Sequence, residues 1–200
     1  MSITLYDTSV SGHSHRVRLF LALLGIEYQT IDVDMRKGEH KTPDYLKLSP
    51  LGQVPTLVDG NDVITDSTAA LVYLAKKYGD ENWLPEDPAG AAKIQRWLST
   101  ASGELFRGPV IARAIKLFDR DYYYDDASMW TDRLLTWMQT ELEAKTWLAA
   151  EHVTIADIAM YSYLRVANEG EIDMEPYPAI LRWLGDVEKL PGFLPMIKSI

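Results

Sequence analysis

The sequence of 200 residues contains no cysteine. This absence excludes disulfide frameworks, thiolate metal sites and a cysteine nucleophile. No uninterrupted apolar run reaches the roughly 18 residues that a membrane-spanning helix needs. The first residues, Met1 to Asp7, also lack the basic and then apolar pattern of a signal peptide. We therefore expect no membrane association and a cytoplasmic location.

Positive charge is scarce as well. Lysine and arginine total 20 against 29 acidic residues, which gives a net charge of −9. A nucleic-acid-binding protein normally presents a basic face to the phosphates, so we expect no nucleic-acid partner. Two of the four histidines, His13 and His15, lie close together in the sequence, but residues two positions apart face apart on a helix. Because a full ligand set is also missing, we expect no metal site.

Strand and helix patterns alternate over residues 1–79. Strands are predicted at Ile3–Asp7, Tyr28–Val33, Thr56–Val58 and Val63–Thr65, and helices at Ser14–Leu24, Pro43–Leu48 and from Asp66 or Ser67 to Gly79. Two parallel strands joined by a helix are followed by a hairpin, which turns through Asp59-Gly60-Asn61-Asp62. The order βαβ and then ββα predicts a compact α/β domain with a mixed four-stranded sheet.

The composition changes at residues 79–90, which contain two prolines, two glycines and four acids. Such a stretch is typical of a linker, and we assign residues 80–90 to it. Only helix patterns follow in residues 91–200. They are Ala89–Phe118, with a kink or break at Pro109, then Asp126–Lys145, Thr154–Asn168 and Pro178–Leu190. Thr154 and Asp157 have nearly the spacing and chemistry of a capping box, which we interpret as structural. The chain therefore combines an α/β domain with an all-α domain.

A proline begins the third predicted strand, in Gln53-Val54-Pro55-Thr56. Cis peptide bonds occur mainly before proline. A cis bond here would turn the backbone of Val54 outward, where it could pair with an extended peptide. The alternative is an ordinary trans proline at a strand edge.

A second candidate is Asp66-Ser67, at the start of a helix. The hydroxyl and the free N–H groups there favour an anion, and Asp66 could hold an ammonium group. Together they suit the α-amino acid end of a ligand. The alternative is a plain helix cap.

The turn between the first strand and the first helix is rich in serine, with Ser9, Ser11 and Ser14. A serine hydroxyl at a helix start can donate to a thiolate and so stabilise the ionised thiol. The alternative is a turn with a cap. Farther along, His40 and Lys41 could reach a terminal carboxylate, or could simply be a solvated basic pair.

Taken in order, these motifs resemble the cytosolic glutathione S-transferase superfamily, and most of all bacterial members related to the serine-type classes. The resemblance rests on the Ser-rich turn before Val17-Arg18-Leu19, and on Leu24–Tyr28, Leu48–Leu57, Asp66-Ser67, Tyr73–Ala75 and Thr154–Asp157. It implies a thioredoxin-like N-terminal domain, an all-α C-terminal domain and a homodimer. Two departures stand out: Ser49 and His13 occupy positions where related sequences often have asparagine, and His13 puts an ionisable ring beside the thiol.

The resemblance also implies a site for glutathione as co-substrate. The residues implied to bind it are His40, Lys41, Gln53, Val54, Pro55 as a cis proline, Asp66 and Ser67. Ser11 matches the hydroxyl that stabilises the thiolate, with Ser9 and Ser14 as competitors because a serine-rich turn aligns loosely. Tyr6 lies near the tyrosine of other classes but falls within a strand. The residues implied to face the electrophile are Phe106, Arg107, Ile111, Arg113, Ala114 and Leu117.

The implied activity is transfer of glutathione, through its thiolate, to a small and apolar electrophile. One alternative is a glutathione-dependent peroxidase or disulfide reductase, which could use two glutathione molecules and no protein cysteine. The other is a non-catalytic binding or regulatory protein. Such a protein should show damage among Ser11, Pro55, Asp66 and Ser67, and all four are intact. The sequence does not name the electrophile.

Overall fold

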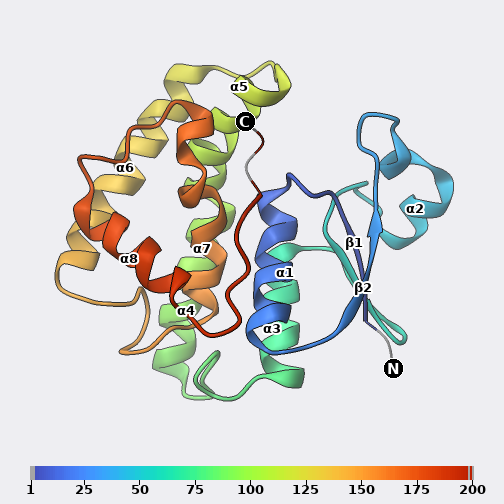
Figure 1. Ribbon diagram of the computed structural model, residues 1–200, viewed down its shortest axis with the longest axis horizontal. Coiled ribbons are helices and arrows are strands. Elements are labelled where there is room, and N and C mark those ends of the chain that lie inside the picture. The colour runs from blue at the N-terminus through green and yellow to red at the C-terminus, as the bar shows by residue number, and fades with distance from the viewer. Residues whose placement is uncertain (1–2, 198, 200) are drawn as a thin grey trace.

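The structure, a computed structural model, describes residues 3–197 and 199 of the chain. Figure 1 shows two halves side by side, a sheet with its helices and a bundle of helices. The chain passes from the first half to the second near Gly79, and its C-terminal segment returns to lie along α1. The α/β and all-α halves predicted from the sequence are therefore confirmed.

The sheet has four strands in the order β2-β1-β3-β4. Their bounds are β1 (Ile3–Asp7), β2 (Tyr28–Asp32), β3 (Thr56–Asp59) and β4 (Asp62–Ile64). β1 pairs parallel with β2 and antiparallel with β3, which in turn forms the expected hairpin with β4. Because β1 is central, its alternate residues are buried, beginning with Ile3. The mixed four-stranded sheet is as the sequence predicts.

Three helices accompany the sheet: α1 (Gly12–Leu23), α2 (Pro43–Leu48) and α3 (Ser67–Tyr78), with a short 3-10 turn η1 (Glu39–Lys41) before α2. α1 and α3 pack on the face that points to the helical half, whereas α2 lies at the other side (Figure 1). Polar side chains fix where these helices begin. Ser11, Thr42 and Asp66 each accept a hydrogen bond from a backbone N–H of the following turn.

The second half consists of helices and turns. They are α4 (Pro88–Ser102), a π-helical turn η2 (Phe106–Val110), α5 (Ile111–Phe118), α6 (Tyr124–Glu143), α7 (Ile155–Arg165), a 3-10 turn η3 (Ala167–Gly170) and α8 (Pro178–Glu188). The break expected at Pro109 is confirmed, and it takes the form of the π-helical turn. The linker ends earlier than predicted, because Asp87 caps α4 and Pro88 begins it.

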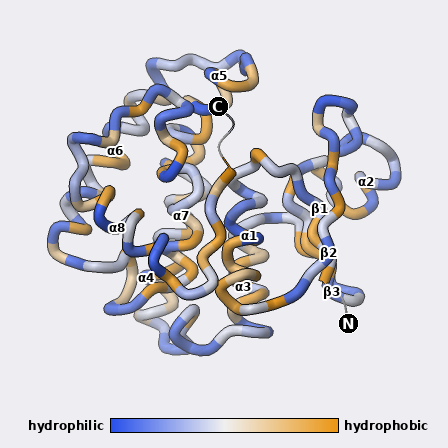
Figure 2. Tube along the Cα trace, viewed as in Figure 1, coloured by the Kyte–Doolittle hydropathy of each residue, from blue (hydrophilic) through white to orange (hydrophobic). Residues whose placement is uncertain are grey.

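The helix α7 joins the two halves. Each of its residues from Ile155 to Leu164 is buried, and it packs against α1, α3, α4 and α8. The capping box predicted at Thr154 and Asp157 is confirmed, and Asp157 also accepts a hydrogen bond from Nε1 of Trp183 at 2.9 Å. Apolar residues gather along the seam beside α1 and α3 in Figure 2, while the outer loops are polar. No helix within residues 3–197 is long and apolar enough to cross a membrane.

Candidate active site at the seam between the two halves

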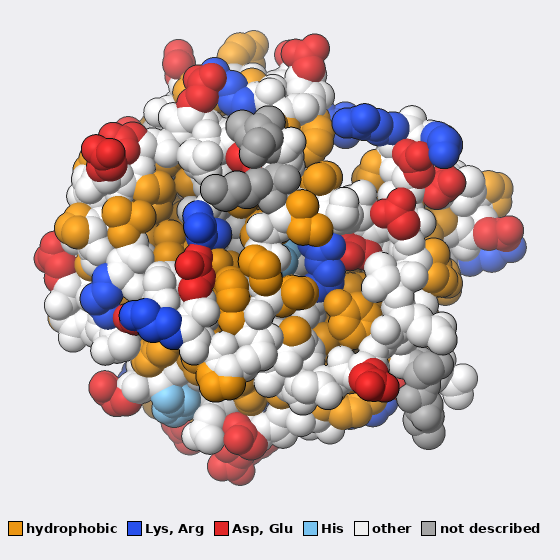
Figure 3. Space-filling view, viewed as in Figure 1, with side chains coloured by type: hydrophobic (Ala, Val, Ile, Leu, Met, Phe, Trp, Pro, Cys, Tyr) orange, Lys and Arg blue, Asp and Glu red, His pale blue; other side chains and the backbone are white. Residues whose placement is uncertain are grey.

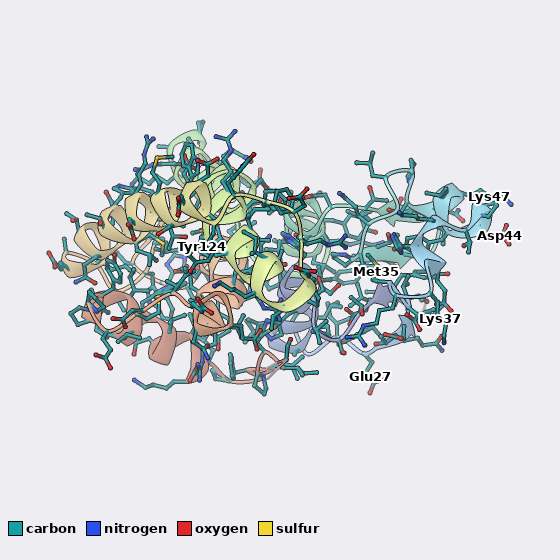
Figure 4. All side chains as sticks on the ribbon, turned by 90° about the horizontal axis from the view of Figure 1, so that it is seen from above. Glu27, Met35, Lys37, Asp44, Lys47 and Tyr124 are labelled. Carbon is teal, nitrogen blue, oxygen red and sulfur yellow. The ribbon has the colours of Figure 1, made fainter. Side chains whose placement is uncertain are left out.

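A cleft of about 1120 Å³ opens between the two halves. Figure 3 shows the surface hollowed between the helical half and the lobe that carries α2. Seen from above in Figure 4, Met35 belongs to the sheet half and Tyr124 to the helical half. Residues of the sheet half that line the cleft include Ser9, Val10, Ser11, His13, Arg16, Met35, Arg36, Gln53, Val54, Pro55, Asp66 and Ser67. Those of the helical half include Ser102, Phe106, Arg113, Lys116, Leu117, Phe118, Arg120 and Tyr163.

Ser11 is the N-cap of α1 and lines this cleft. Its Oγ accepts a hydrogen bond from the N–H of Ser14 at 3.2 Å. A hydroxyl has one donor hydrogen besides its acceptor lone pairs, so the O–H of Ser11 stays available to donate. This hydroxyl lies at the N-terminus of a helix of 12 residues, the positive end of the helix dipole, where negative charge is stabilised. An anion, such as a thiolate, is therefore favoured beside Ser11.

The other two serines of the turn differ in their access to the cleft. Ser9 lines the cleft, and its carbonyl oxygen accepts a hydrogen bond from Nη2 of Arg18 at 2.8 Å. Ser14 is fully buried, and its Oγ has neither exposed surface nor a hydrogen-bond partner among the described residues. Of the three predicted candidates, Ser9 and Ser11 face the cleft.

Asp66 and Ser67 form the start of α3. The carboxylate of Asp66 caps the helix through Oδ1, which accepts from the N–H groups of Thr68 and Ala69, each at 2.8 Å. Burial favours the neutral acid, but these hydrogen bonds and the charge of Arg16 outweigh it and lower the pKa of Asp66. The carboxylate is therefore ionised at neutral pH. Its second oxygen, Oδ2, makes no side-chain or cap hydrogen bond within the described part of the chain.

A buried arginine, Arg16 of α1, connects the groups at the two helix starts. Its Nη1 donates to Oγ of Ser67 at 3.1 Å and lies 3.0 Å from Nδ1 of His13. Burial lowers the pKa of Arg16 to about 10, which leaves it cationic at neutral pH. Sequence analysis missed Arg16 as a site residue, since an arginine on a helix is usually exposed. Only its contact with Ser67 of α3 shows its role.

The loop before β3 holds the third set of predicted residues. The peptide bond between Val54 and Pro55 is cis. The β1–β3 ladder begins only at Thr56, so the backbone of Val54 lies outside it and beside the cleft. Ser49 closes the loop: its Oγ donates to the carbonyl of Gln53 and accepts from the N–H of Gln53, both at 3.1 Å. The hydroxyl of Ser49 thus fixes the backbone just before Val54.

His13 lies within an aromatic cage at the floor of the cleft. Tyr163 of α7 packs edge-on against the imidazole with ring centroids 4.9 Å apart, and Phe106 of η2 stacks on it at 6.2 Å. Burial, together with the charge of Arg16, lowers the pKa of His13 to about 3 despite the opposing charge of Asp66. The imidazole is therefore neutral at physiological pH. Tyr163 was not predicted, because only tertiary packing brings α7 to this turn.

On the helical side of the cleft, three of the six residues predicted to face an electrophile line it, namely Phe106, Arg113 and Leu117. The other three, Arg107, Ile111 and Ala114, are not among its lining residues. The guanidinium of Arg107 instead lies over the ring of Trp130, 5.0 Å from its centroid. Helix α5 therefore presents to the cleft the face that carries Arg113 and Leu117.

Arg113 is held by three partners within the protein. Its Nε donates to Glu169 at 2.6 Å, its Nη1 to the carbonyl of Val10 at 3.0 Å and its Nη2 to Oγ of Ser199 at 2.9 Å. Both side chains of the ion pair with Glu169 are buried. These contacts let the guanidinium fix the backbone beside Ser11, and the expectation that Arg113 steadies an anionic substrate stays a prediction.

The loop that follows β2 gives a further difference from the expected site. His40 and Lys41 lie in η1 and are not among the residues that line the cleft, whereas Met35 and Arg36 are. Lys41 is exposed, and His40 is half-buried. No group of three side chains of the metal-binding types lies together anywhere in residues 3–197 or at 199.

A thioredoxin-like sheet with a cis proline beside a helix start, followed by a helical half that closes a cleft over it, defines the cytosolic glutathione transferase fold. The family models for the glutathione S-transferase N-terminal and C-terminal domains match residues 10–77 and 106–191. Glutathione S-transferase Z1 of Arabidopsis thaliana is 31% identical over 96% of this chain and 89% of its own. The chain belongs to the glutathione S-transferase family, as its motifs predicted.

Solved structures agree with this assignment. A possible glutathione S-transferase from Rhodopseudomonas palustris is 31% identical and superimposes with a TM-score of 0.91, over 100% of both chains. A glutathione transferase homologue from Drosophila mojavensis, solved with bound glutathione, has a TM-score of 0.86 at 27% identity, over 95% of this chain and 89% of its own. The similarity therefore extends over both halves of the chain.

Proposed function

We propose that the protein is a transferase that activates the thiol of glutathione at Ser11 and directs the thiolate at a small electrophile in the cleft. The observation that carries this proposal is the position of Ser11. Its O–H is free to donate, it caps the helix α1, and it faces the cleft that Asp66 and Ser67 also line. A hydroxyl donor and a helix N-terminus both stabilise the thiolate form of a bound thiol.

The remaining groups suit the ends of a tripeptide. The ammonium of the γ-glutamyl group pairs with Asp66, whose carboxylate is ionised, and its carboxylate accepts from Ser67 and the N–H groups of α3. The cysteinyl backbone pairs with Val54, which lies outside the β1–β3 ladder and lines the cleft, and Gln53 lies alongside. For the glycyl carboxylate, Arg36 lines the cleft, while the assignment of His40 and Lys41 stays a prediction.

Calorimetric titration with reduced glutathione tests this proposal. Wild type should bind in the micromolar to low-millimolar range, and Ser67→Ala should bind at least tenfold more weakly, because hydrogen bonds to charged groups contribute about 1.5–3 kcal/mol. Ser99→Ala is the matched control, since Ser99 lies on α4 and is not among the residues lining the cleft. Absence of binding to wild type would refute the proposal.

The protein is also proposed to act as a homodimer, in two domains joined by the linker. Dimerisation is expected from the family and is tested by light scattering coupled to size-exclusion chromatography. The cytoplasmic location stays a prediction.

A further inference from the structure

The neutral imidazole of His13 has a defined tautomer. Nη1 of Arg16 can only donate, so Nδ1 of His13, 3.0 Å away, accepts. In a neutral imidazole the proton then resides on Nε2. The aromatic cage of Phe106 and Tyr163 holds the ring in this orientation. His13 is therefore a fixed N–H donor and carries no charge.

The donor end of the ring faces the cleft. Nδ1 and Nε2 lie on nearly opposite sides of the five-membered ring, so Nε2 is directed away from Arg16. Within residues 3–197 and 199, Nε2 has no hydrogen-bond partner, yet it is not among the fully buried nitrogens that lack one. The side chain of His13 is partly exposed, and it lines the cleft. An unused donor at this position points to a ligand oxygen.

The surroundings of Nε2 belong to the side of the cleft where the electrophile would lie. His13 is two residues from Ser11, and Phe106 and Tyr163 enclose it from the helical half. Two cations of the helical half that line the cleft, Arg113 and Lys116, are engaged by other residues. Arg113 is held by Glu169, Val10 and Ser199, and Lys116 pairs with Glu171 at 2.5 Å. His13 is thus a donor two residues from the proposed thiolate site that is left unused within the described residues.

We propose that His13 is a further catalytic residue, whose Nε2–H donates to the carbonyl oxygen of a conjugated electrophile as the thiolate adds to it. This inference rests on the proposed transferase function. The sulfur forms a bond to the β-carbon, the C=C π bond breaks, and its electron pair moves through the conjugated system to the oxygen, which becomes an enolate. Nε2–H stabilises that oxygen, and water then protonates the α-carbon. No oxidant or reductant is needed.

The neutrality of His13 fits this role. A donor that is already uncharged needs no proton from solvent, and it does not compete with Ser11 for the thiolate as a cation would. A preorganised N–H aimed at a developing negative charge speeds reactions by roughly a hundredfold to a thousandfold. Displacement of a halide from saturated carbon, in which no oxygen gains charge, receives no such assistance. Comparing the rates with these two kinds of electrophile therefore distinguishes the role of His13 from that of Ser11.

The test compares kcat/KM for crotonaldehyde and for benzyl chloride, both with glutathione. His13→Phe keeps a ring between Phe106 and Tyr163 but removes the N–H, whereas His13→Asn keeps an acceptor for Arg16 and an N–H donor. His152→Phe is the matched control, because His152 is exposed and bonds the carbonyl of Asn82 at 3.0 Å, on the linker. Circular dichroism and calorimetry with glutathione verify that each variant is folded and binds the tripeptide.

The expected result is a crotonaldehyde-to-benzyl chloride ratio that falls at least tenfold in His13→Phe, recovers in part in His13→Asn and stays at the wild-type value in His152→Phe. An unchanged ratio in His13→Phe, or a parallel loss of both activities, would overturn the role of His13. If wild type binds glutathione but consumes neither electrophile, the inference fails while the tripeptide site stands. If wild type does not bind glutathione, the proposed function itself fails.

Discussion

Nη1 of Arg16 lies 3.1 Å from Oγ of Ser67, although the two residues are 51 positions apart in the sequence. The contact joins the starts of α1 and α3 at the floor of the cleft. Within the described part of the chain no carboxylate forms an ion pair with Arg16, and its Nε and Nη2 are buried without a partner. A buried cation of this kind raises the affinity of the floor for an anion and directs the O–H of Ser67 outward.

Arg16→Met should therefore weaken the binding of glutathione about tenfold or more, since it removes a donor and a positive charge beneath the position proposed for the γ-glutamyl carboxylate. Calorimetry at pH 7 measures the dissociation constant. Lys93→Met is the control, because it removes one positive charge from the exposed face of α4. Equal affinity of Arg16→Met and wild type would show that the cation does not act on the ligand.

Ser11→Ala should lower kcat/KM at pH 7 by about a hundredfold, the cost of one donor to a developing or bound anion. The thiol of bound glutathione would then ionise at higher pH, so the rise of kcat/KM with pH should shift upward. Ser9→Ala provides the comparison, since Ser9 also faces the cleft. A larger effect in Ser9→Ala than in Ser11→Ala would reassign the thiolate donor to Ser9.

Gly12 leaves room for the ring of Tyr163. A Cβ at this position would lie 2.7 Å from Cε2 and Cζ of that ring. Gly12→Ala should therefore lower the free energy of unfolding by about 1–3 kcal/mol through overpacking. Gly185→Ala in α8 should act in the opposite direction, by about 0.5–1 kcal/mol, because a Cβ there meets nothing within 4 Å and alanine favours the helix. Urea denaturation measures both changes, and equal signs would contradict the argument.

His13 and His15 should make the protein less stable as the pH falls. Burial lowers the pKa of His13 to about 3 and that of His15 to about 4. In the unfolded chain each titrates near its ordinary value of about 6.5, so below that pH the unfolded state binds more protons. The free energy of unfolding is thus highest above pH 6.5. It falls as the pH drops from 6.5 towards the lowered pKa values, by up to about 1.4 kcal/mol per pH unit for each histidine.

Urea denaturation at pH 7 and pH 5 tests this linkage, because most carboxyl groups titrate below that range. His15 has a clear neutral tautomer: its Nε2 donates to the carbonyl of Leu194 and its Nδ1 accepts from Ser162, both at 2.9 Å. In the double variant His13→Asn and His15→Gln the loss of stability between the two pH values should be smaller. The same loss in the variant and in wild type would rule out these histidines as its source.

Because Arg113 and Glu169 form an ion pair, the effects of mutating them on the free energy of unfolding should be strongly non-additive. Arg113→Met leaves Glu169 as a buried, uncompensated charge, which should cost about 3–5 kcal/mol of stability. Adding Glu169→Gln removes that charge, so the double variant should be more stable than Arg113→Met alone. Additive losses in thermal denaturation would contradict the importance of the pair. The backbone of Val10 is released in either case, so kcat should stay low in both.

Local chemistry determines most elements of this fold, which is why the sequence predicts them. The hairpin turn at Asp59–Asp62, the cap at Asp66 and the helix stop at Gly25, whose φ is +66°, each depend on a few neighbouring residues. The connection between α4 and α5 is harder to predict from the sequence. Pro109 signals a break, but whether the chain bends by a loop or by the π-helical turn of η2 depends on packing against α6.

The residues of the candidate site are also of two kinds, those that local motifs predict and those that only tertiary packing brings to the cleft. Ser11, Val54, Asp66 and Ser67 follow from motifs within one turn or loop, and all four line the cleft. Arg16 and Tyr163 could not be found from local patterns, because an arginine and a tyrosine on apolar helices have no signal until α1, α3 and α7 are packed together. The sequence did single out His13, but its tautomer and its neutrality depend on Arg16 and on burial.

The contacts of the C-terminal segment have a consequence for the order in which the site is completed. The backbone of Val10 is fixed by Arg113, which in turn bonds Ser199, and His15 bonds Leu194, 179 positions away. Contacts between residues so far apart in the sequence carry a large loop-closure cost and form more slowly than local elements. A chain whose sheet and helices have already formed should therefore remain inactive until this segment docks against α1 and Arg113.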